Sequence, residues 1–175
     1  MDAERFDALV ATHHGEIYRY LLRATSRRTE ADDLAQDTFL RAYRAHRTLP
    51  PDANARAWLF TIASNVAKNH FRAESRRRQA HAAVRQTRSE TDGTGPEGET
   101  LFNETRAALD TVVADLPLKQ RLAFTLRKVH DLDYDTIARS LDCSPDSARA
   151  HVFQALRKIR RSLNGSELPL GRDER

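Results

Sequence analysis

The sequence predicts an all-α protein with two small helical domains joined by a flexible linker. Apolar residues recur at helical spacing on both sides of the segment 77–104. Much of that segment is rich in Gln, Thr, Ser, Asp and Gly, a composition that buries too little apolar surface to offset the entropy of ordering. The predicted boundaries are 1–76 for the N-terminal domain, 105–165 for the C-terminal domain and 166–175 for a tail. No strand-like alternation persists in the chain.

The N-terminal domain is predicted to contain three main helices, over about 3–25, 29–45 and 53–76. A stiff loop containing Pro50 and Pro51 separates the last two. Each helix has an apolar stripe at helical spacing. The stripes consist of Phe6, Leu9, Val10, Ile17, Tyr20, Leu21 and Ala24, then Ala31, Leu34, Ala35, Thr38, Phe39, Ala42 and Tyr43, and finally Leu59, Ile62, Ala63, Val66 and Ala67.

A polar, partly acidic face lies beside the stripe of the second helix. It consists of Asp33, Gln36, Asp37 and Arg41. Carboxylates in a first helical turn interact favourably with the helix dipole, typically by about 0.3–1 kcal/mol. That role explains Glu30, Asp32 and Asp33, but Asp37 lies a full turn further in. We therefore interpret the face as a docking surface, with a solvated helix face as the alternative.

The third helix carries Trp58 beside a polar and basic face. The face consists of Thr61, Asn65, Lys68, Asn69, Arg72 and Arg76. Asn, Lys and Arg side chains next to an aromatic ring can follow phosphates and stack on or hydrogen-bond to unpaired bases. In the alternative interpretation, Trp58 belongs to the core and the polar face is simply hydrated.

Four helices are expected in the C-terminal domain, over about 100–114, 118–130, 133–141 and 145–163, with a break at Pro117. The last two are typical of a helix-turn-helix, whose second helix suits the DNA major groove. Its predicted buried stripe consists of Ala148, Val152, Ala155, Ile159 and Leu163.

The start of the last helix has its own local signals. Ser144 is placed to cap the first amides, and Pro145 stands at the first helical position, where a missing N–H costs nothing. Residues 146–163 carry five basic side chains against one acid. An ordinary helical hairpin with a solvated basic face is the alternative.

The composition excludes several classes of protein. Charged residues make up 31% of the 175 residues and the mean hydropathy is −0.68, as expected of a soluble chain. No apolar run approaches the ~20 residues that span a bilayer, and the N-terminus lacks the apolar segment of a signal peptide. The single cysteine, Cys143, excludes an internal disulfide framework and suits a reducing cytoplasm. A net charge of +4 is compatible with nucleic-acid binding.

Taken in order, these segments resemble the extracytoplasmic-function (ECF) group of bacterial sigma-70-type sigma factors. Residues 30–43 and 57–65 are similar to the family's second conserved region, and residues 116–121 with the helix-turn-helix to its fourth. The resemblance implies an N-terminal region 2 bundle of three to four helices and a C-terminal region 4 domain. It also implies an alternative sigma factor that binds the RNA polymerase core, recognises −10 and −35 promoter elements and aids promoter melting.

The resemblance gives the N-terminal surfaces their roles. The second helix is implied to dock on the β′ clamp of the polymerase through Asp33, Gln36, Asp37, Phe39 and Arg41. The third helix and the loop before it are implied to engage the −10 element and hold a flipped base, through Leu49, Trp58, Asn65, Lys68, Asn69 and Arg72. Capture of an extruded base draws forward an unwinding step that costs roughly a few kcal/mol.

The C-terminal domain is implied to read the −35 element while it contacts the β flap. Base contacts are expected from Arg127, Arg149, Ala150, Phe153 and Gln154. One bidentate arginine–guanine pair contributes about 1–3 kcal/mol of discrimination. Phosphate or flap contacts are expected from Arg157, Lys158, Arg160 and Arg161. His151 and Gln154 stand where many relatives have arginine, which predicts a shifted −35 preference.

No catalytic residue, metal site, cofactor or small-molecule substrate is expected. The seven histidines are scattered, and no Gly-rich phosphate loop, nucleophile elbow or paired-carboxylate arrangement occurs. The resemblance implies an anti-sigma factor as a further partner, often membrane-bound, and a cytoplasmic location at the nucleoid. A redox role of Cys143 stays open.

A different class of function is also open, that of a free-standing helix-turn-helix repressor or activator with a dimerising or ligand-sensing N-terminal domain. A dimerising regulator would need an apolar N-terminal seam. The acidic Asp33–Asp37 face and the long linker therefore favour the sigma factor.

Overall fold

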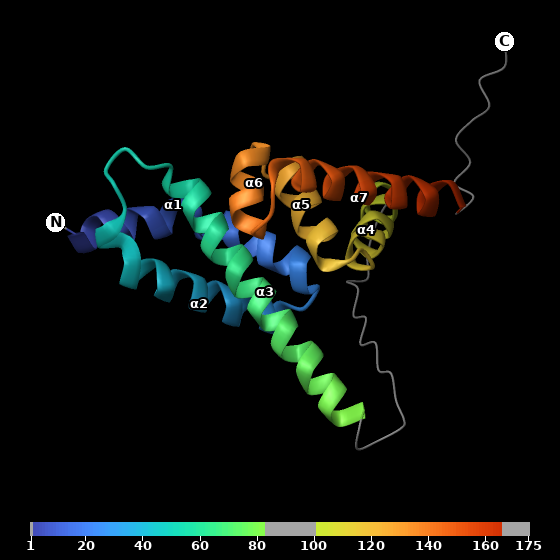
Figure 1. The fold of residues 1–175 in the computed structure, drawn as a ribbon, viewed down its shortest axis with the longest axis horizontal. Helices are drawn as coiled ribbons and strands as arrows, with labels where there is room; N and C mark the ends of the chain where they lie inside the picture. The colour runs from blue at the N-terminus through green and yellow to red at the C-terminus, as the bar shows by residue number, and fades with distance from the viewer. Residues whose placement is uncertain (1, 83–100, 166–175) are drawn as a thin grey trace, which may run out of the picture.

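The computed structural model describes residues 2–82 and 101–165, which form seven α-helices and one short 3-10 helix (Figure 1). The N-terminal domain consists of α1 (Asp2–Thr25), α2 (Arg28–Ala45), the 3-10 helix η1 (His46–Thr48) and α3 (Ala55–Ala82). The C-terminal domain consists of α4 (Leu101–Ala114), α5 (Leu118–Lys128), α6 (Tyr134–Leu141) and α7 (Pro145–Gly165). Within the described ranges no strand is present, and the predicted all-α class is confirmed. The predicted tail and most of the predicted linker lie outside the described residues.

The apolar stripes of α1, α2 and α3 meet in one core, as their spacing predicts. Tyr20 and Phe60 are fully buried at its centre, with their rings edge to face at 5.4 Å between centroids. The Tyr20 and Ser64 hydroxyl oxygens are 2.7 Å apart, so the buried phenol has a hydrogen-bond partner. Burial raises the pKa of Tyr20. Phe60 and Ser64 are buried but lie outside the predicted stripe of α3. Helix α3 is therefore buried on more than one side.

Two expectations for the N-terminal domain are wrong. Tyr43, predicted in the core, is 52% exposed. The end of α2 is covered only by η1 and the start of α1. There the Tyr43 and Phe6 rings meet edge to face, with 5.2 Å between their centroids. Helix α3 continues to Ala82, past the predicted end at 76. The apolar stripe stops there, but Arg, Gln and Ala are good helix formers, and a Glu74–Arg78 ion pair of 3.4 Å supports the last turns.

Local sequence sets the geometry of the helix-turn-helix. The Asp133 carboxylate accepts a hydrogen bond from the Thr136 amide at 2.8 Å and so caps α6. The Ser144 hydroxyl accepts one from the Ser147 amide at 3.1 Å, which confirms its predicted capping role at the start of α7. Between the two helices, Asp142 adopts a left-handed conformation (φ 54°) that ends α6 and closes the turn.

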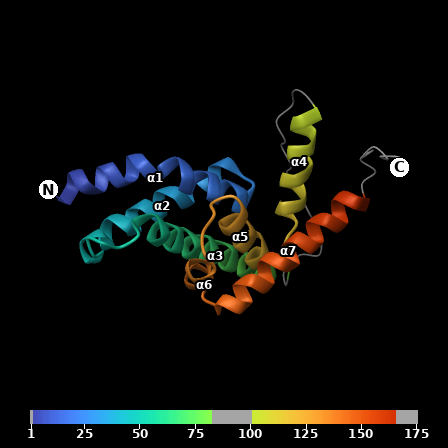
Figure 2. The same cartoon turned by 90° about the horizontal axis from the view of Figure 1, so that it is seen from above.

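The two domains pack directly against each other (Figures 1 and 2). Helix α6 contacts α3, and α5 contacts α1. One hydrophobic cluster contains buried side chains of both domains, among them Phe60, Leu122 and Ile137. The hydroxyl oxygens of Thr61 and Ser140 are 3.1 Å apart across the contact. Sequence periodicity predicted two tethered modules and did not indicate this contact.

The Asp133 cap gives a test of stability with a defined pH dependence. Hydrogen bonds from the Thr136 amide and hydroxyl hold the pKa of Asp133 below its usual value. Its stabilisation is therefore present above a pH of about 4 and is lost as the pH falls through the folded-state pKa. Asp133→Ala should lower the free energy of unfolding by about 1 kcal/mol at pH 7, measured by urea denaturation, with a smaller loss at pH 3.

The matched control is Asp135→Ala, which removes a carboxylate from the same first turn of α6 and keeps the hydrogen bond from the Thr136 amide to the Asp133 cap. It should cost only a few tenths of a kcal/mol, because only the interaction with the helix dipole is lost. Equal losses for the two variants would contradict the capping role of Asp133.

Candidate docking and nucleic-acid interfaces

The predicted docking face on α2 is largely exposed. Asp33, Gln36 and Arg41 are exposed, and Asp37 is half-buried. Arg41 Nε donates a hydrogen bond to Asp37 Oδ1 at 2.9 Å, one turn away, and this bond raises the pKa of Arg41. Phe39, predicted on the same face, is only 8% exposed and stacks on His14 at 5.4 Å between ring centroids. Phe39 therefore lies beneath the face and not on its surface.

A groove between α1 and α2 adjoins this face. Its walls include Val10, His14, Asp32, Asp33, Phe39 and Leu40. Leu40 is 46% exposed, so apolar area is available at the rim as well as on the floor. An apolar groove with carboxylates along one edge fits the apolar face of an amphipathic helix whose flanks are basic. The groove therefore gives the predicted docking face a concave surface, which α2 alone does not provide.

The predicted −10 residues of α3 divide into two groups. Asn65, Asn69 and Arg72 are exposed and, at spacings of four and three residues, share one face of the helix. Trp58 and Lys68 are half-buried, and Trp58 packs against the core cluster that both domains form. The sixth residue, Leu49, is half-buried in the loop after η1. The structure therefore leaves only part of this predicted face open.

The C-terminal domain changes the surroundings of Lys68. Burial lowers the pKa of Lys68, and the Asp142 carboxylate from the turn between α6 and α7 acts in the opposite direction. Lys119 of α5 and Arg72 add like charges that also lower it. A side chain predicted to meet DNA thus lies within the electrostatic influence of the helix-turn-helix.

A polar cluster of Glu16, Arg56 and His130 joins the two domains. Arg56 Nε lies 3.1 and 3.0 Å from the two Glu16 carboxylate oxygens, and its Nη2 donates to the His130 carbonyl at 2.7 Å. His130 Nδ1 lies 3.2 Å from Glu16 Oε1. Burial opposes ionisation of Glu16, but hydrogen bonds from Arg56 and His130 outweigh it and keep the pKa of Glu16 below its usual value. Burial also lowers the pKa of His130, which favours the neutral ring.

A second polar connection runs from α5 to α1. Arg121 Nη1 donates to the Ala24 carbonyl, and Nη2 donates to the Leu116 carbonyl at 3.1 Å. The guanidinium also lies over the Phe71 ring at 5.7 Å from the centroid. The contacts of Arg121 and of the Glu16–Arg56–His130 cluster are not predicted by the sequence, because partners 40 to 114 positions apart leave no local pattern.

The predicted base-reading residues of α7 lie on an exposed face. Phe153 is 65% exposed, and Arg149, Ala150 and Gln154 are also exposed. The helix-turn-helix geometry places this face outward because the opposite stripe of α7, from Ala148 to Ile159, is buried against α4, α5 and α6. The structure thus brings four of the five predicted residues together on one helix.

Tyr134, at the start of α6, connects two of the predicted base readers. Its ring centroid lies 5.1 Å from Arg149 Cζ and 5.2 Å from Arg127 Cζ, within cation–π range. Arg127 of α5 also donates to the Leu132 carbonyl at 3.1 Å, and Arg149 donates to Asp146 at 2.8 Å. The spacing of Tyr134 fits an apolar stripe along α6, so the sequence alone indicates a core residue and not a contact with the two arginines.

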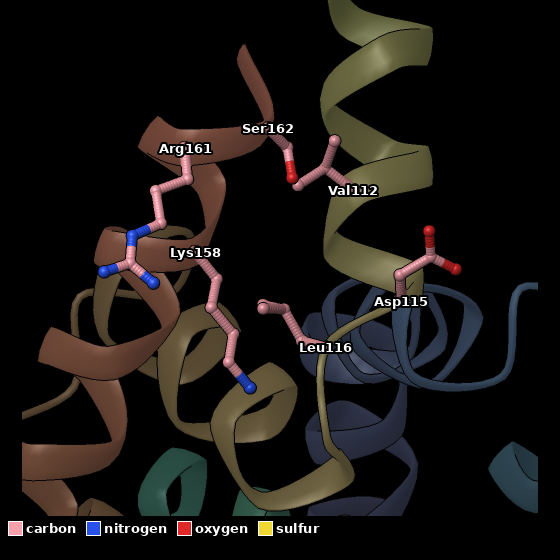
Figure 3. A pocket seen from close by; sticks show the side chains of 6 residues that line it. All are labelled: Val112, Asp115, Leu116, Lys158, Arg161 and Ser162. Carbon is pink, nitrogen blue, oxygen red and sulfur yellow. The ribbon is translucent and has the colours of Figure 1, made fainter. Parts of the chain in front are cut away.

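Two of the predicted phosphate or flap residues line a small pocket between α4 and α7 (Figure 3). Lys158 and Arg161 come from α7, and Val112, Asp115 and Leu116 come from the end of α4 and the turn after it. Arg157 and Arg160 are exposed elsewhere along α7. The pocket offers a small apolar floor with cations at its edge, a combination that suits a protein loop better than a base pair.

Some further features bear on function. Among the residues that the structure describes, no group of three or more His, Cys, Asp or Glu side chains could hold a metal ion. None of the described helices is long and apolar enough to cross a membrane. Cys143 is a half-buried free thiol in the turn of the helix-turn-helix.

Comparison with protein families gives two matches. The Sigma-70 region 2 model matches residues 9–77, and the Sigma-70, region 4 model matches residues 106–159. The chain is 31% identical over 169 residues to the RNA polymerase sigma-H factor of Pseudomonas aeruginosa, covering 93% of this chain and 88% of that protein. It is 30% identical over 165 residues to the ECF RNA polymerase sigma-E factor of Escherichia coli K12, covering 90% and 86%.

Two solved structures share the fold. The sigma factor RpoE from Bartonella quintana, in complex with the anti-sigma factor NepR, matches with a TM-score of 0.74 at 20% identity, covering 94% of this chain and 99% of that chain. CnrH, in complex with the cytosolic domain of CnrY, matches with a TM-score of 0.68 at 21% identity, covering 94% and 91%. At these identities the likeness concerns the arrangement of the helices.

Proposed function

Because this chain belongs to the extracytoplasmic-function group of the sigma-70 family, we propose which of its residues carry out the steps of transcription initiation. The chain is an alternative sigma factor that binds the RNA polymerase core and directs promoter-specific transcription. The alternative of a free-standing helix-turn-helix regulator does not account for a region 2 domain. We assign each step of initiation to a surface of its own.

The groove between α1 and α2 is the proposed docking site for the clamp helices of the β′ subunit. Asp33 and Gln36 line one edge of the groove, and the buried ring of Phe39 forms the floor. The Asp37–Arg41 pair continues the polar face of α2 beyond the groove. This combination of an apolar groove with an acidic edge supports the docking assignment. The pocket lined by Lys158 and Arg161 is the proposed contact with the β flap.

Promoter recognition is divided between α3 and α7. On α3, Asn65, Asn69 and Arg72 provide the exposed part of the proposed −10 face. The half-buried Leu49, Trp58 and Lys68 complete it. On α7, Arg149, Ala150, Phe153 and Gln154 face outward for the −35 element, with Arg127 beside them. The observation that carries the −35 assignment is the exposure of Phe153, an apolar side chain held out on a basic helix.

The proposal extends to partners and location. Sigma factors are initiation factors without catalysis of their own, and we assign no catalytic role to this chain. The RpoE relative is seen with an anti-sigma factor, and we propose that a protein of that kind also restrains this one. A cytoplasmic location, at the nucleoid when active, follows from these partners.

Run-off transcription with core polymerase and a randomised promoter library tests the function as a whole. The chain should direct transcripts from a subset of sequences that share a −10 and a −35 element. Core polymerase alone should give none of them, and the absence of any chain-dependent transcript would contradict the sigma-factor assignment.

Asp33→Lys tests the docking groove. Reversing the charge at the edge of the groove should weaken binding to core polymerase at least tenfold, measured by fluorescence anisotropy of the labelled chain. The matched control Asp135→Lys makes the same charge change on α6, outside the groove, and should bind core as the wild type does. Equal affinities for both variants would place the docking surface elsewhere.

Arg149→Ala tests the base-reading assignment. The variant should lose preference at one position of the −35 element, by about 1–3 kcal/mol of discrimination. Arg160→Ala, on the same helix, should instead weaken all sequences about equally, because a phosphate contact carries no sequence information. Transcription from a library randomised only in the −35 element distinguishes the two patterns, and uniform weakening by Arg149→Ala would refute its role in base reading.

A further inference from the structure

Two arginines of the proposed −35 face come from different helices and meet at one aromatic ring. Arg127 lies in the last turn of α5, and Arg149 lies near the start of α7. Their Cζ atoms are 5.2 and 5.1 Å from the ring centroid of Tyr134, the first residue of α6. The two guanidinium groups are therefore no further apart than twice that distance, and as like charges they repel each other. The negative face of the ring attracts both cations and so offsets that repulsion.

We propose that Tyr134 is a positioning residue for −35 recognition, whose ring holds Arg127 and Arg149 in the arrangement in which they meet the bases. In this role Tyr134 acts through the two arginines and does not itself read a base. The proposal rests on the proposed function, because the arrangement of the arginines matters only if they read the −35 element.

The ring is held in place by the core and by the turn into α6. Tyr134 is half-buried and packs against the hydrophobic cluster. The residue before it, Asp133, accepts hydrogen bonds from the amide and the hydroxyl of Thr136 at 2.8 and 2.9 Å. The Leu132 amide donates to the Leu126 carbonyl at 3.0 Å, which closes the turn onto α5. A ring fixed in this way can orient the flexible side chains that lie on it.

The carboxylates near the two arginines hold them less firmly than the ring does. Arg149 donates to Asp146 at 2.8 Å, and Arg127 donates to Asp131 at 3.3 Å. Both carboxylate side chains are 93% exposed, and ion pairs so fully hydrated contribute little. Arg127 has a further contact, a hydrogen bond of 3.1 Å to the Leu132 carbonyl. The ring is thus the support that the two arginines have in common.

Contact with the ring leaves both arginines able to read bases. A guanidinium that lies over a ring keeps the N–H groups along its edge, and an arginine reads guanine O6 and N7 with two such N–H groups. A free arginine loses rotamer freedom when a base orders it, and an arginine already held on a ring loses less. At a rise of about 3.4 Å per base pair, the separation of the two guanidinium groups spans at most roughly three base pairs. Tyr134 therefore links the reading of neighbouring base pairs.

Tyr134→Leu and Tyr134→Phe test the proposal by transcription with core polymerase from a library randomised in the −35 element. Arg127→Ala and Arg149→Ala first identify the positions that each arginine reads. At those positions Tyr134→Leu should reduce the base preference at least about threefold, whereas Tyr134→Phe, which keeps the ring, should stay within about twofold of the wild type. Base preference is a ratio within one library, so it does not depend on how much of a variant is folded.

Two further chains control for the loss of a tyrosine and for the shape of the ring. Tyr18→Leu makes the same change at another half-buried tyrosine of the same cluster, on α1, and should keep the wild-type preference. Replacement of Tyr134 by pentafluorophenylalanine keeps a ring of similar shape but removes the attraction of its face for cations. That chain should lose preference as Tyr134→Leu does.

Unchanged preference in Tyr134→Leu, alongside a loss in Arg149→Ala, would overturn the positioning role. Equal, sequence-independent weakening by Tyr134→Leu and Tyr134→Phe would also overturn it, because the hydroxyl would then act as a phosphate contact. If neither Arg127→Ala nor Arg149→Ala changed any preference, the −35 assignment itself would fail, and the role of Tyr134 with it.

Discussion

The contact between α3 and α6 decides which surfaces of this chain are available. Helix α3 carries the proposed −10 face, and α6 is the first helix of the helix-turn-helix. The Thr61–Ser140 hydrogen bond and a hydrophobic cluster common to both domains hold the two helices together. The same part of α3 cannot face α6 and DNA at once, so the use of the half-buried Trp58 and Lys68 depends on whether this contact is made. Asn65, Asn69 and Arg72 are exposed while it is made.

The energetics of that contact set what a partner must supply. Partly exposed ion pairs such as Glu16–Arg56 contribute at most about 1 kcal/mol each, so most of the stability of the contact between the domains comes from apolar burial. Moving a two-state equilibrium from 1:99 to 99:1 takes about 5.5 kcal/mol of differential affinity. A partner that binds the two domains only when they are apart must supply differential affinity of about that size to separate them.

Sequence reasoning found the elements of the fold but not their assembly. Apolar spacing and the break at Pro117 predict all seven helices, and the position of Ser144 predicts a cap, because these signals lie within a few neighbouring residues. Arg56 and His130 meet across 74 positions, and neither residue differs locally from an ordinary polar residue. Tyr43 and Phe39 show the other limit: spacing indicates which face of α2 turns inward, but it does not tell how far the neighbouring helices cover that face.

The contact between the domains covers the two proposed DNA-binding surfaces unequally. On α7, Phe153 is 65% exposed and the Arg149 side chain 56%, so the proposed −35 face is open while the domains are together. That element is read as a duplex, which requires no melting. The −10 element is used as separated strands, and there Trp58 and Lys68 are partly covered. The contact between the domains therefore leaves the proposed −35 face open and covers only part of the proposed −10 face.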